Sequence, residues 1–288
     1  MNLGIVTSKE IAQLTAEDRL LAQAFQKQGI SATAVVWSDP EIEWNNFDAL
    51  VIRSCWDYHR KVGEFMHWVG NIEQLRVPIS NAPEIVRWNY HKGYLRGLQD
   101  QGVTIIPTQW YKAGEQPLLV NVMEENDWPE IILKPSVGAT AYKTQKLDSV
   151  AAEKHQWDHP YPQGFMVQKF MSEILSAGEW SLVFFGGRYS HGVLKLARDG
   201  EFRVQSDFGG TRQLQEPGAG IIAQCEHILE CCPGSALYTR IDGIEIRGVF
   251  HLMEVELIEP ELYMFNDELA HKFVEAFRAG DYYQNFDR

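Results

Sequence analysis

Cysteines, positive charges and long apolar runs are scarce in this sequence. Its 288 residues include four cysteines, too few to staple a chain of this length, so we expect reduced thiols at Cys55, Cys225, Cys231 and Cys232. No apolar run approaches the roughly 20 residues of a membrane span, and residues 1–7 read as a strand rather than a charged-then-apolar leader. We therefore expect a cytoplasmic protein that does not bind a membrane.

Basic residues are outnumbered by acidic ones. There are 26 Lys and Arg against 39 Asp and Glu, a formal net charge of −13. Such a balance disfavours a nucleic-acid partner, and any phosphate must be held by a few local cations. The 45% hydrophobic and 12% aromatic content is enough for one large core or for several small lobes.

The first part of the chain alternates strands and helices. Apolar runs predict strands over 3–6, 32–37 and 48–53, with a helix over 16–28 closed by Gly29 and another helix reaching Leu75. This is an α/β pattern. A proline-rich break over 77–83 places a domain boundary near residue 84.

The strand over 48–53 ends in a polar and aromatic segment, Arg53-Ser-Cys-Trp56-Asp57-Tyr58-His59. Ligands of parallel α/β sheets bind at the carboxyl ends of strands, which makes Arg53, Trp56 and Asp57 candidate substrate contacts. An aromatic cap over the edge of the sheet explains the same residues equally well.

The next segment combines a lysine with small residues. Patterns predict a helix over 85–101, a strand over 104–108, a helix over 117–125 and a strand over 130–134 that ends at Lys134. A lysine in an apolar strand is costly unless its ammonium reaches water or an anion, and the loop after Ser136 lets backbone N–H groups approach a phosphate. The spacing is not that of a Walker A loop.

The strand-rich second half contains carboxylates in two neighbouring motifs, Tyr238-Thr-Arg-Ile-Asp242-Gly and Met253-Glu-Val-Glu-Leu-Ile-Glu-Pro260. Alternation along a strand puts Glu254 and Glu256 on one face, and Asp242 can add a third oxygen ligand. An all-carboxylate set suits Mg²⁺ or Mn²⁺. The alternative is a solvated strand face.

Taken together, these motifs resemble the ATP-grasp superfamily of ADP-forming carboxylate–amine ligases. The resemblance implies an α/β N-terminal lobe (1–84) followed by two α+β lobes (85–164 and 165–288) that clamp ATP. It also implies ATP-binding roles for Lys92, Lys134 and the loop from Ser136, with Gln168, Lys169, Phe170 and Met171 at adenine and Glu179 at ribose.

The same resemblance assigns Lys195 and Arg203 to the transferring phosphate and Asp242, Glu254 and Glu256 to Mg²⁺. A solvated hairpin is the alternative for Lys195 and Arg203. The sequence most resembles the D-cycloserine-forming branch, which closes a ureido-serine derivative into a ring, on motifs such as Arg53 to His59, Tyr189-Ser-His191-Gly-Val and 253–260. It departs from the superfamily pattern at His91, where Asp is common, and at Glu256, where Asn is usual.

The implied activity is ATP-dependent activation of a small carboxylate as an acyl-phosphate, which an amine then attacks. An ATP-grasp kinase and a non-catalytic ATP-binding regulatory module are the alternatives. The partners expected are the small carboxylate and amine, and the resemblance leaves a homodimer open. His191 is a candidate substrate-orienting residue or a packing residue.

Overall fold

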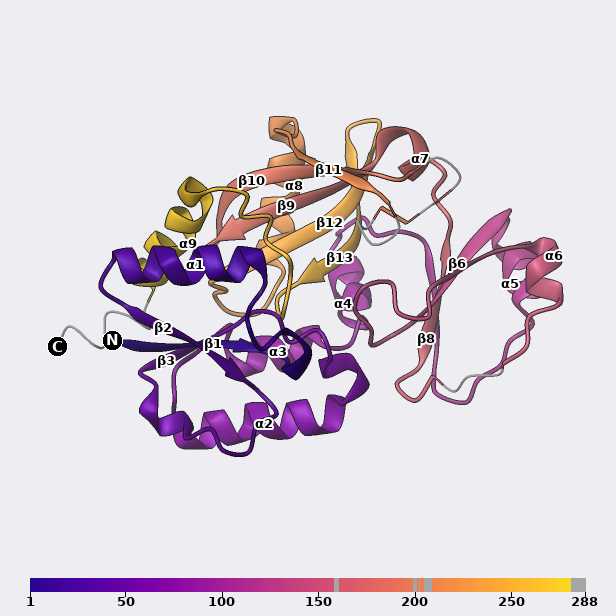
Figure 1. Ribbon diagram of the computed structural model, residues 1–288. Coiled ribbons are helices and arrows are strands. Elements are labelled where there is room, and N and C mark those ends of the chain that lie inside the picture. The colour runs from indigo at the N-terminus through magenta and orange to yellow at the C-terminus, as the bar shows by residue number, and fades with distance from the viewer. Residues whose placement is uncertain (158–160, 199–200, 202, 205–208, 281–288) are drawn as a thin grey trace.

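The computed structural model describes residues 1–157, 161–198, 201, 203–204 and 209–280, and these form three sheets (Figure 1). In Figure 1 the N-terminal sheet lies at lower left, the C-terminal sheet above it and the central sheet at right. In the described part of the chain, no helix is both long and apolar enough to cross a membrane.

The N-terminal sheet is parallel, with the order β2-β1-β3-β4. Its core strand β3 is buried at every residue, as its uninterrupted apolar run predicts. Thr15 caps α1 by accepting a hydrogen bond from the Asp18 N–H, which fixes where that helix begins. The elements of this lobe are β1 (Asn2–Thr7), η1 (Lys9–Ile11), α1 (Ala16–Lys27), β2 (Ser31–Val36), η2 (Trp44–Asn46), β3 (Ala49–Ile52), η3 (Tyr58–Arg60), α2 (Val62–Leu75) and β4 (Ile79–Ser80).

The single helix predicted over 85–101 is wrong, because the chain forms two short helices, α3 (Pro83–Asn89) and α4 (Tyr94–Asp100). The Asn89 side chain donates to the Val255 carbonyl and accepts from the Leu257 N–H, and the Tyr94 hydroxyl also bonds to the Val255 backbone. These contacts with a distant strand outweigh the local helical pattern. The break leaves Lys92 in the turn between the helices.

The central sheet is antiparallel, with the order β5-β8-β6-β7. The strand predicted over 104–108 is wrong: β5 begins only at Thr108, and Ile105 instead forms an isolated bridge with Leu252. The elements are β5 (Thr108–Tyr111), α5 (Leu119–Asn126), β6 (Glu130–Pro135), β7 (Gln145–Asp148), α6 (Ser149–Glu153) and β8 (Phe165–Lys169).

The C-terminal sheet is also antiparallel, with the order β11-β10-β9-β12-β13. The predicted hairpin at Gly186-Gly187 is confirmed, and both glycines have positive φ. The elements are α7 (Ile174–Ala177), β9 (Glu179–Phe185), β10 (Arg188–Leu196), β11 (Thr211–Leu214), α8 (Ala219–Glu230), β12 (Tyr238–Ile246), β13 (Val249–Glu256) and α9 (Asp267–Ala279).

Two hydrophobic cores join parts of the chain that the sequence assigned to different domains. Phe25 of α1 packs edge-on against Phe273 and Phe277 of α9, and the two helices lie side by side in Figure 1. Likewise α4 packs in one core with β9, β12 and β13. Strand β8 pairs within the central sheet, so the chain leaves that sheet after Lys169. The three-domain division remains a prediction.

Candidate active site

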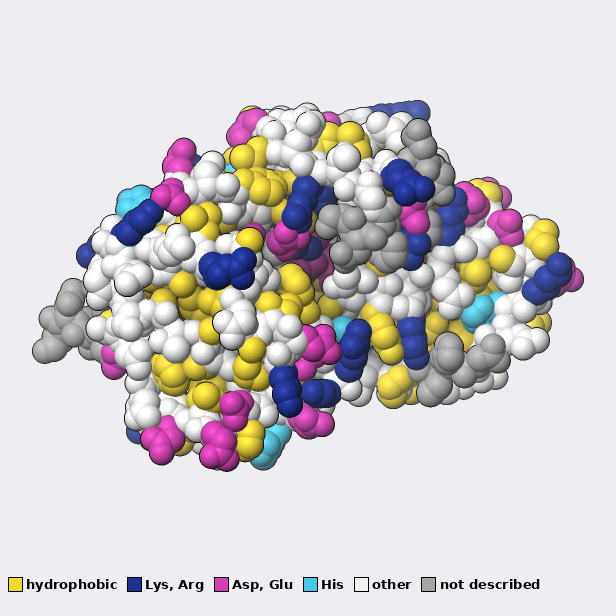
Figure 2. All heavy atoms as spheres, in the orientation of Figure 1, with side chains coloured by type: hydrophobic (Ala, Val, Ile, Leu, Met, Phe, Trp, Pro, Cys, Tyr) yellow, Lys and Arg dark blue, Asp and Glu magenta, His cyan; other side chains and the backbone are white. Residues whose placement is uncertain are grey.

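A cavity of about 410 Å³ lies where the three sheets meet. Figure 2 shows acidic and basic side chains gathered in a hollow near the middle of one face. Most of the residues singled out in the sequence line this cavity: Trp56, Lys92, Lys134, Gln168, Lys169, Phe170, Met171, Glu179, Lys195, Arg203, Asp242, Glu254 and Glu256.

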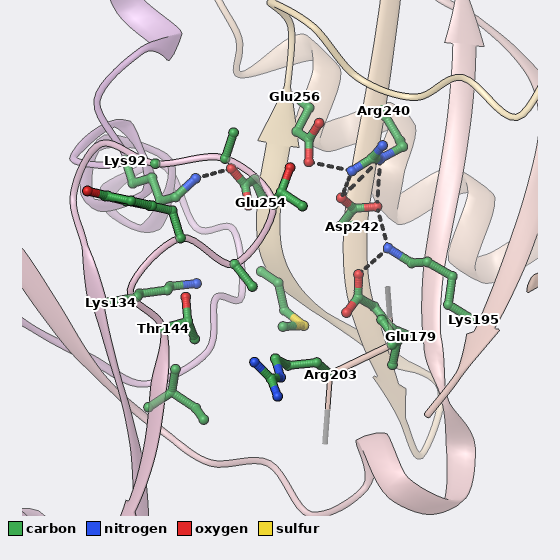
Figure 3. Close-up of a pocket in the computed structure, with 18 of the residues that line it drawn as sticks. Lys92, Lys134, Thr144, Glu179, Lys195, Arg203, Arg240, Asp242, Glu254 and Glu256 are labelled. Carbon is green, nitrogen blue, oxygen red and sulfur yellow. Dashed lines mark hydrogen bonds and ion pairs between the residues drawn. The ribbon is translucent and has the colours of Figure 1, made fainter. Parts of the chain in front are cut away.

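One wall of the cavity is a buried network of charges on β9, β10 and β12 (Figure 3). The Lys195 ammonium pairs with Glu179 and lies 3.4 Å from an Asp242 oxygen. Burial alone would lower the pKa of Lys195, but Asp242 and Glu179 outweigh it and raise that pKa. Lys195 is therefore a permanently charged group inside the cavity.

Arg240 completes this network, and the sequence analysis missed it. Its guanidinium is held at 2.8 to 3.1 Å from the Asp242 carboxylate and also pairs with Glu256. Strand alternation offered the signal, since residues 240 and 242 share one face of β12. Burial acts to raise the pKa of Asp242, yet Arg240 and Lys195 hold it well below its usual range.

On the opposite side, Lys92 pairs with Glu254 across the cavity (Figure 3). Asp242 and Glu254 are direct neighbours in the β12–β13 register. Burial and repulsion from Glu254 and Asp242, partly offset by Arg240, raise the pKa of Glu256 to about 8. The cavity thus concentrates carboxylates that repel one another and need cations.

The donor chemistry of Asp242, Glu254 and Glu256 suits a hard divalent cation, because all their donor atoms are carboxylate oxygens. In the structure each of them is neutralised by Lys92, Lys195 or Arg240. Over the described ranges, no three His, Cys, Asp or Glu side chains are gathered closely enough to hold a metal ion. The ion pairs of Glu254 and Glu256 each use one carboxylate oxygen, Oε1, so the second oxygen of each side chain is a further donor for a cation.

Lys134 projects from β6 toward the middle of the cavity (Figure 3). Within the described part of the chain, its ammonium has no hydrogen-bond or ion-pair partner, and burial lowers its pKa to about 8. The loop that follows has positive φ at Thr140, Ala141 and Lys143, and residues 138–142 line the cavity. Ser136 is buried, and its carbonyl accepts a hydrogen bond from the Lys92 N–H.

The other end of the cavity is mainly apolar. Ile106, Ile132, Met171, Ile174 and Ile244 line it beside Phe170. The Gln168 side-chain amide donates to the Thr108 hydroxyl at 2.9 Å. An apolar end with a neighbouring amide suits an aromatic heterocycle.

Three candidate substrate residues lie outside the cavity lining. Arg53 is buried against Asp18 and Glu17, and Asp57 accepts a hydrogen bond from the Trp37 indole. His191 bonds to the Leu262 carbonyl at 2.9 Å, and burial lowers its pKa to about 4, so its ring is neutral near pH 7. Trp56 alone of this group lines the cavity.

The architecture matches solved ATP-grasp structures. A RimK domain ATP-grasp protein from Sphaerobacter thermophilus superposes with a TM-score of 0.69 at 15% identity, covering 96% of this chain and 99% of the other. The D-alanine–D-alanine ligase of Bacillus anthracis complexed with ATP gives 0.67 at 14% identity over 97% and 98%. The chain therefore has the ATP-grasp fold, as its sequence motifs predict.

More specific likeness points to one protein. The family model described as D-cycloserine synthetase DcsG, N-terminal domain, matches residues 3–81. The cycloserine biosynthesis protein DcsG of Streptomyces lavendulae is 27% identical over 292 aligned positions, covering 95% of this chain and 97% of that protein. A crystal structure of D-cycloserine synthetase DcsG superposes with a TM-score of 0.85 at 24% identity, over 97% and 99% of the two chains. The predicted resemblance to this branch is confirmed.

Proposed function

We propose that the protein is an ATP-dependent, ADP-forming ligase that activates a small amino-acid-like carboxylate for attack by an amine. The observation that carries this proposal is the cavity itself, where Lys134, which has no partner among the described residues, faces a wall of paired charges: Lys195, Arg240, Asp242 and Glu179. The likeness to DcsG supports ring closure within one molecule as the form the ligation takes.

Each cation has a distinct task in this proposal. Lys92 and Lys134 bind the ATP phosphates, and the backbone N–H groups of residues 138–142 approach the same phosphates. Lys195, Arg203 and Arg240 stabilise the negative charge that develops as the γ-phosphoryl group moves to the substrate carboxylate. The amine then attacks the acyl-phosphate carbon and phosphate leaves. No side-chain nucleophile takes part.

The remaining nucleotide contacts follow the cavity lining. We propose adenine at Gln168, Lys169, Phe170 and Met171, and ribose at Glu179. Asp242, Glu254 and Glu256 would hold Mg²⁺ or Mn²⁺, which neutralises phosphate oxygens when bound.

The proposal also covers the domain boundaries, the cellular location, the partners and the quaternary state. The three proposed lobes are residues 1–84, 85–164 and 165–288, and each range contains most of one sheet. Strand β8 is the exception, because it falls in the third range but pairs within the central sheet. We propose a cytoplasmic enzyme whose partners are a small carboxylate and a small amine, without nucleic acid or membrane, and with a homodimer as one quaternary state.

The test is release of ADP and phosphate from Mg²⁺-ATP over a panel of amino acids, ureido-amino acids and dipeptides. We expect release with one panel compound only, and a loss of at least about 100-fold in Glu254→Gln and Arg203→Ala. Glu245→Gln serves as the matched control, since Glu245 lies on β12 outside the cavity lining.

Other outcomes separate the alternatives. A phosphorylated product without phosphate release would identify a kinase. ATP binding without turnover on any compound, unaltered by Arg203→Ala, would identify a regulatory module.

A further inference from the structure

One carboxylate in the cavity stands apart from the others. Six acidic side chains line the cavity: Glu179, Asp242, Glu254, Glu256, Glu259 and Glu261. Five of them pair with a lysine or arginine. Among the described residues, only the Glu259 side chain of this set has no hydrogen-bond or ion-pair partner, although its exposed fraction is 9%.

Leaving a buried carboxylate unpaired is costly. Burial and repulsion from Glu256 raise the pKa of Glu259 well above its usual range. Buried polar groups in native proteins nearly always have a partner, and ionisable groups with strongly shifted pKa values cluster at functional sites. Glu259 lines the cavity, so the cationic group of a bound molecule can reach it there.

The surroundings of Glu259 are suited to an organic cation. The Trp56 indole N–H donates to the Glu259 carbonyl at 3.0 Å, so Trp56 and Glu259 lie side by side on the cavity wall. Tyr58 also lines this part, and its pKa is raised by burial and next by Glu259, so its ring carries a neutral hydroxyl. A carboxylate beside aromatic rings attracts ammonium groups through ion pairing and cation–π contact.

The backbone that carries Glu259 is held in place by the N-terminal lobe. Arg53 donates to the Pro260 carbonyl at 2.9 Å, and the Glu17 carboxylate accepts from the N–H groups of Leu262 and Met264. A rigidly held backbone presents a side chain at a fixed position, as a specificity-determining residue requires.

We propose that Glu259, with Trp56 beside it, binds the ammonium group of the substrate. The inference rests on the proposed ligase function and narrows its substrate class to carboxylates that also carry a free amino group. The substrate carboxylate then points toward Lys195 and Arg240, and the ammonium toward Glu259. A 2-hydroxy acid of the same shape lacks the cation and is discriminated against.

The experiment compares matched ligands by calorimetry with Mg²⁺ and a non-hydrolysable ATP analogue present. The probes are alanine, serine and O-ureidoserine in both configurations, each beside its 2-hydroxy counterpart, such as lactate for alanine and glycerate for serine. The proteins are wild type, Glu259→Gln, Glu259→Asp and the control Glu245→Gln.

We expect wild type to bind at least one amino acid about 10- to 100-fold more tightly than its 2-hydroxy counterpart, the range of a charge-assisted hydrogen bond. Glu259→Gln abolishes this preference by weakening amino-acid binding alone, while Glu259→Asp keeps part of it. Nucleotide affinity and Mg²⁺ dependence stay unchanged in both, and Glu245→Gln behaves as wild type.

Three outcomes would overturn the inference. They are equal wild-type affinity for the two ligand classes, equal losses for both classes in Glu259→Gln, and a changed Mg²⁺ dependence in that variant. Because this assay measures substrate binding and not ADP release, its outcome can be distinguished from a failure of the proposed ligase function. If amino-acid binding depends on Glu259 but no ADP is released, the proposed ligase function is wrong and the proposed ammonium-binding role of Glu259 stands.

Discussion

The Arg53 guanidinium donates a hydrogen bond to the Pro260 carbonyl, joining the end of β3 to a loop 207 residues further along the chain. The same guanidinium is paired with Asp18 at 2.9 Å and with Glu17 at 2.7 Å. Glu17 in turn accepts from the backbone of residues 262 and 264. Arg53 therefore acts on the cavity indirectly, by fixing the loop that carries Glu259 and Tyr263.

Replacing Arg53 should destabilise the fold. Arg53→Met leaves Asp18 and Glu17 buried without their cation, a loss of about 3–5 kcal/mol in the free energy of unfolding. Urea denaturation measures this. Arg60→Met is the control, because Arg60 is exposed and lies 3.9 Å from Glu10, so we expect a change within about 0.5 kcal/mol. Equal unfolding midpoints for the two variants would contradict the structural role of Arg53.

ATP affinity should fall as the pH rises past about 8. Burial lowers the pKa of Lys134 to about 8, so the free protein carries this charge below that pH and loses it above. Bound phosphate favours the charged form, which means that binding above pH 8 requires proton uptake. We expect the dissociation constant of ATP to rise by up to about tenfold per pH unit above 8 and to be flat below it.

Lys134→Arg tests the origin of this pH dependence, since arginine stays charged throughout the range. Calorimetric titration from pH 6.5 to 9.5 should give a smaller decline in ATP affinity for the variant than for wild type, with Glu256, whose pKa is about 8, as the group that still titrates in this range. A parallel decline in both proteins would assign the effect to another group.

Arg240→Lys should reduce turnover strongly. Arg240 binds Asp242 through two nitrogens and also contacts Glu256 and the Glu261 carbonyl, a fork that a single ammonium does not reproduce. We expect kcat to fall by about 10²–10³-fold. Arg247→Lys, at an exposed turn, is the control. Steady-state ADP release measures both, and an unaltered kcat in Arg240→Lys would exclude a role in catalysis.

Site residues were predicted correctly from the sequence where their position depends on local patterns, and not where it depends on contacts between residues far apart in the chain. Strand alternation placed Glu254 and Glu256 in the cavity, because that pattern is local. The rule that ligands bind at the carboxyl ends of parallel strands marked Arg53 and Asp57 as candidate substrate contacts. Their side chains instead contact Asp18 and Trp37, partners that only the tertiary structure brings close.

The secondary structure shows the same contrast between local patterns and long-range contacts. Most strands and helices were predicted near their observed limits. The break between α3 and α4 was not, because Asn89 and Tyr94 bind β13 more than 160 residues away. Arg240 was overlooked although it shares a strand face with Asp242, a signal that was present in the sequence.

Gly178 immediately precedes Glu179, and a side chain there should disrupt this wall of the cavity. Its φ of 78° and ψ of −176° belong to a region open essentially to glycine alone, and an added Cβ would lie 2.7 Å from the Lys195 carbonyl oxygen. Gly178→Ala should lower the free energy of unfolding by about 3 kcal/mol and weaken turnover, since it pushes apart the strands that carry Glu179 and Lys195.

Gly187→Ala is the matched control for this last prediction. Gly187 also has a positive φ, of 75°, but nothing lies within 4 Å of its added Cβ, so backbone strain acts there without a clash. We expect a loss of about 1 kcal/mol and unchanged turnover. Urea denaturation and ADP release on both variants separate the two effects. If the losses in stability are equal, crowding against the Lys195 carbonyl contributes nothing, and the close approach of these two segments is not what requires glycine at position 178.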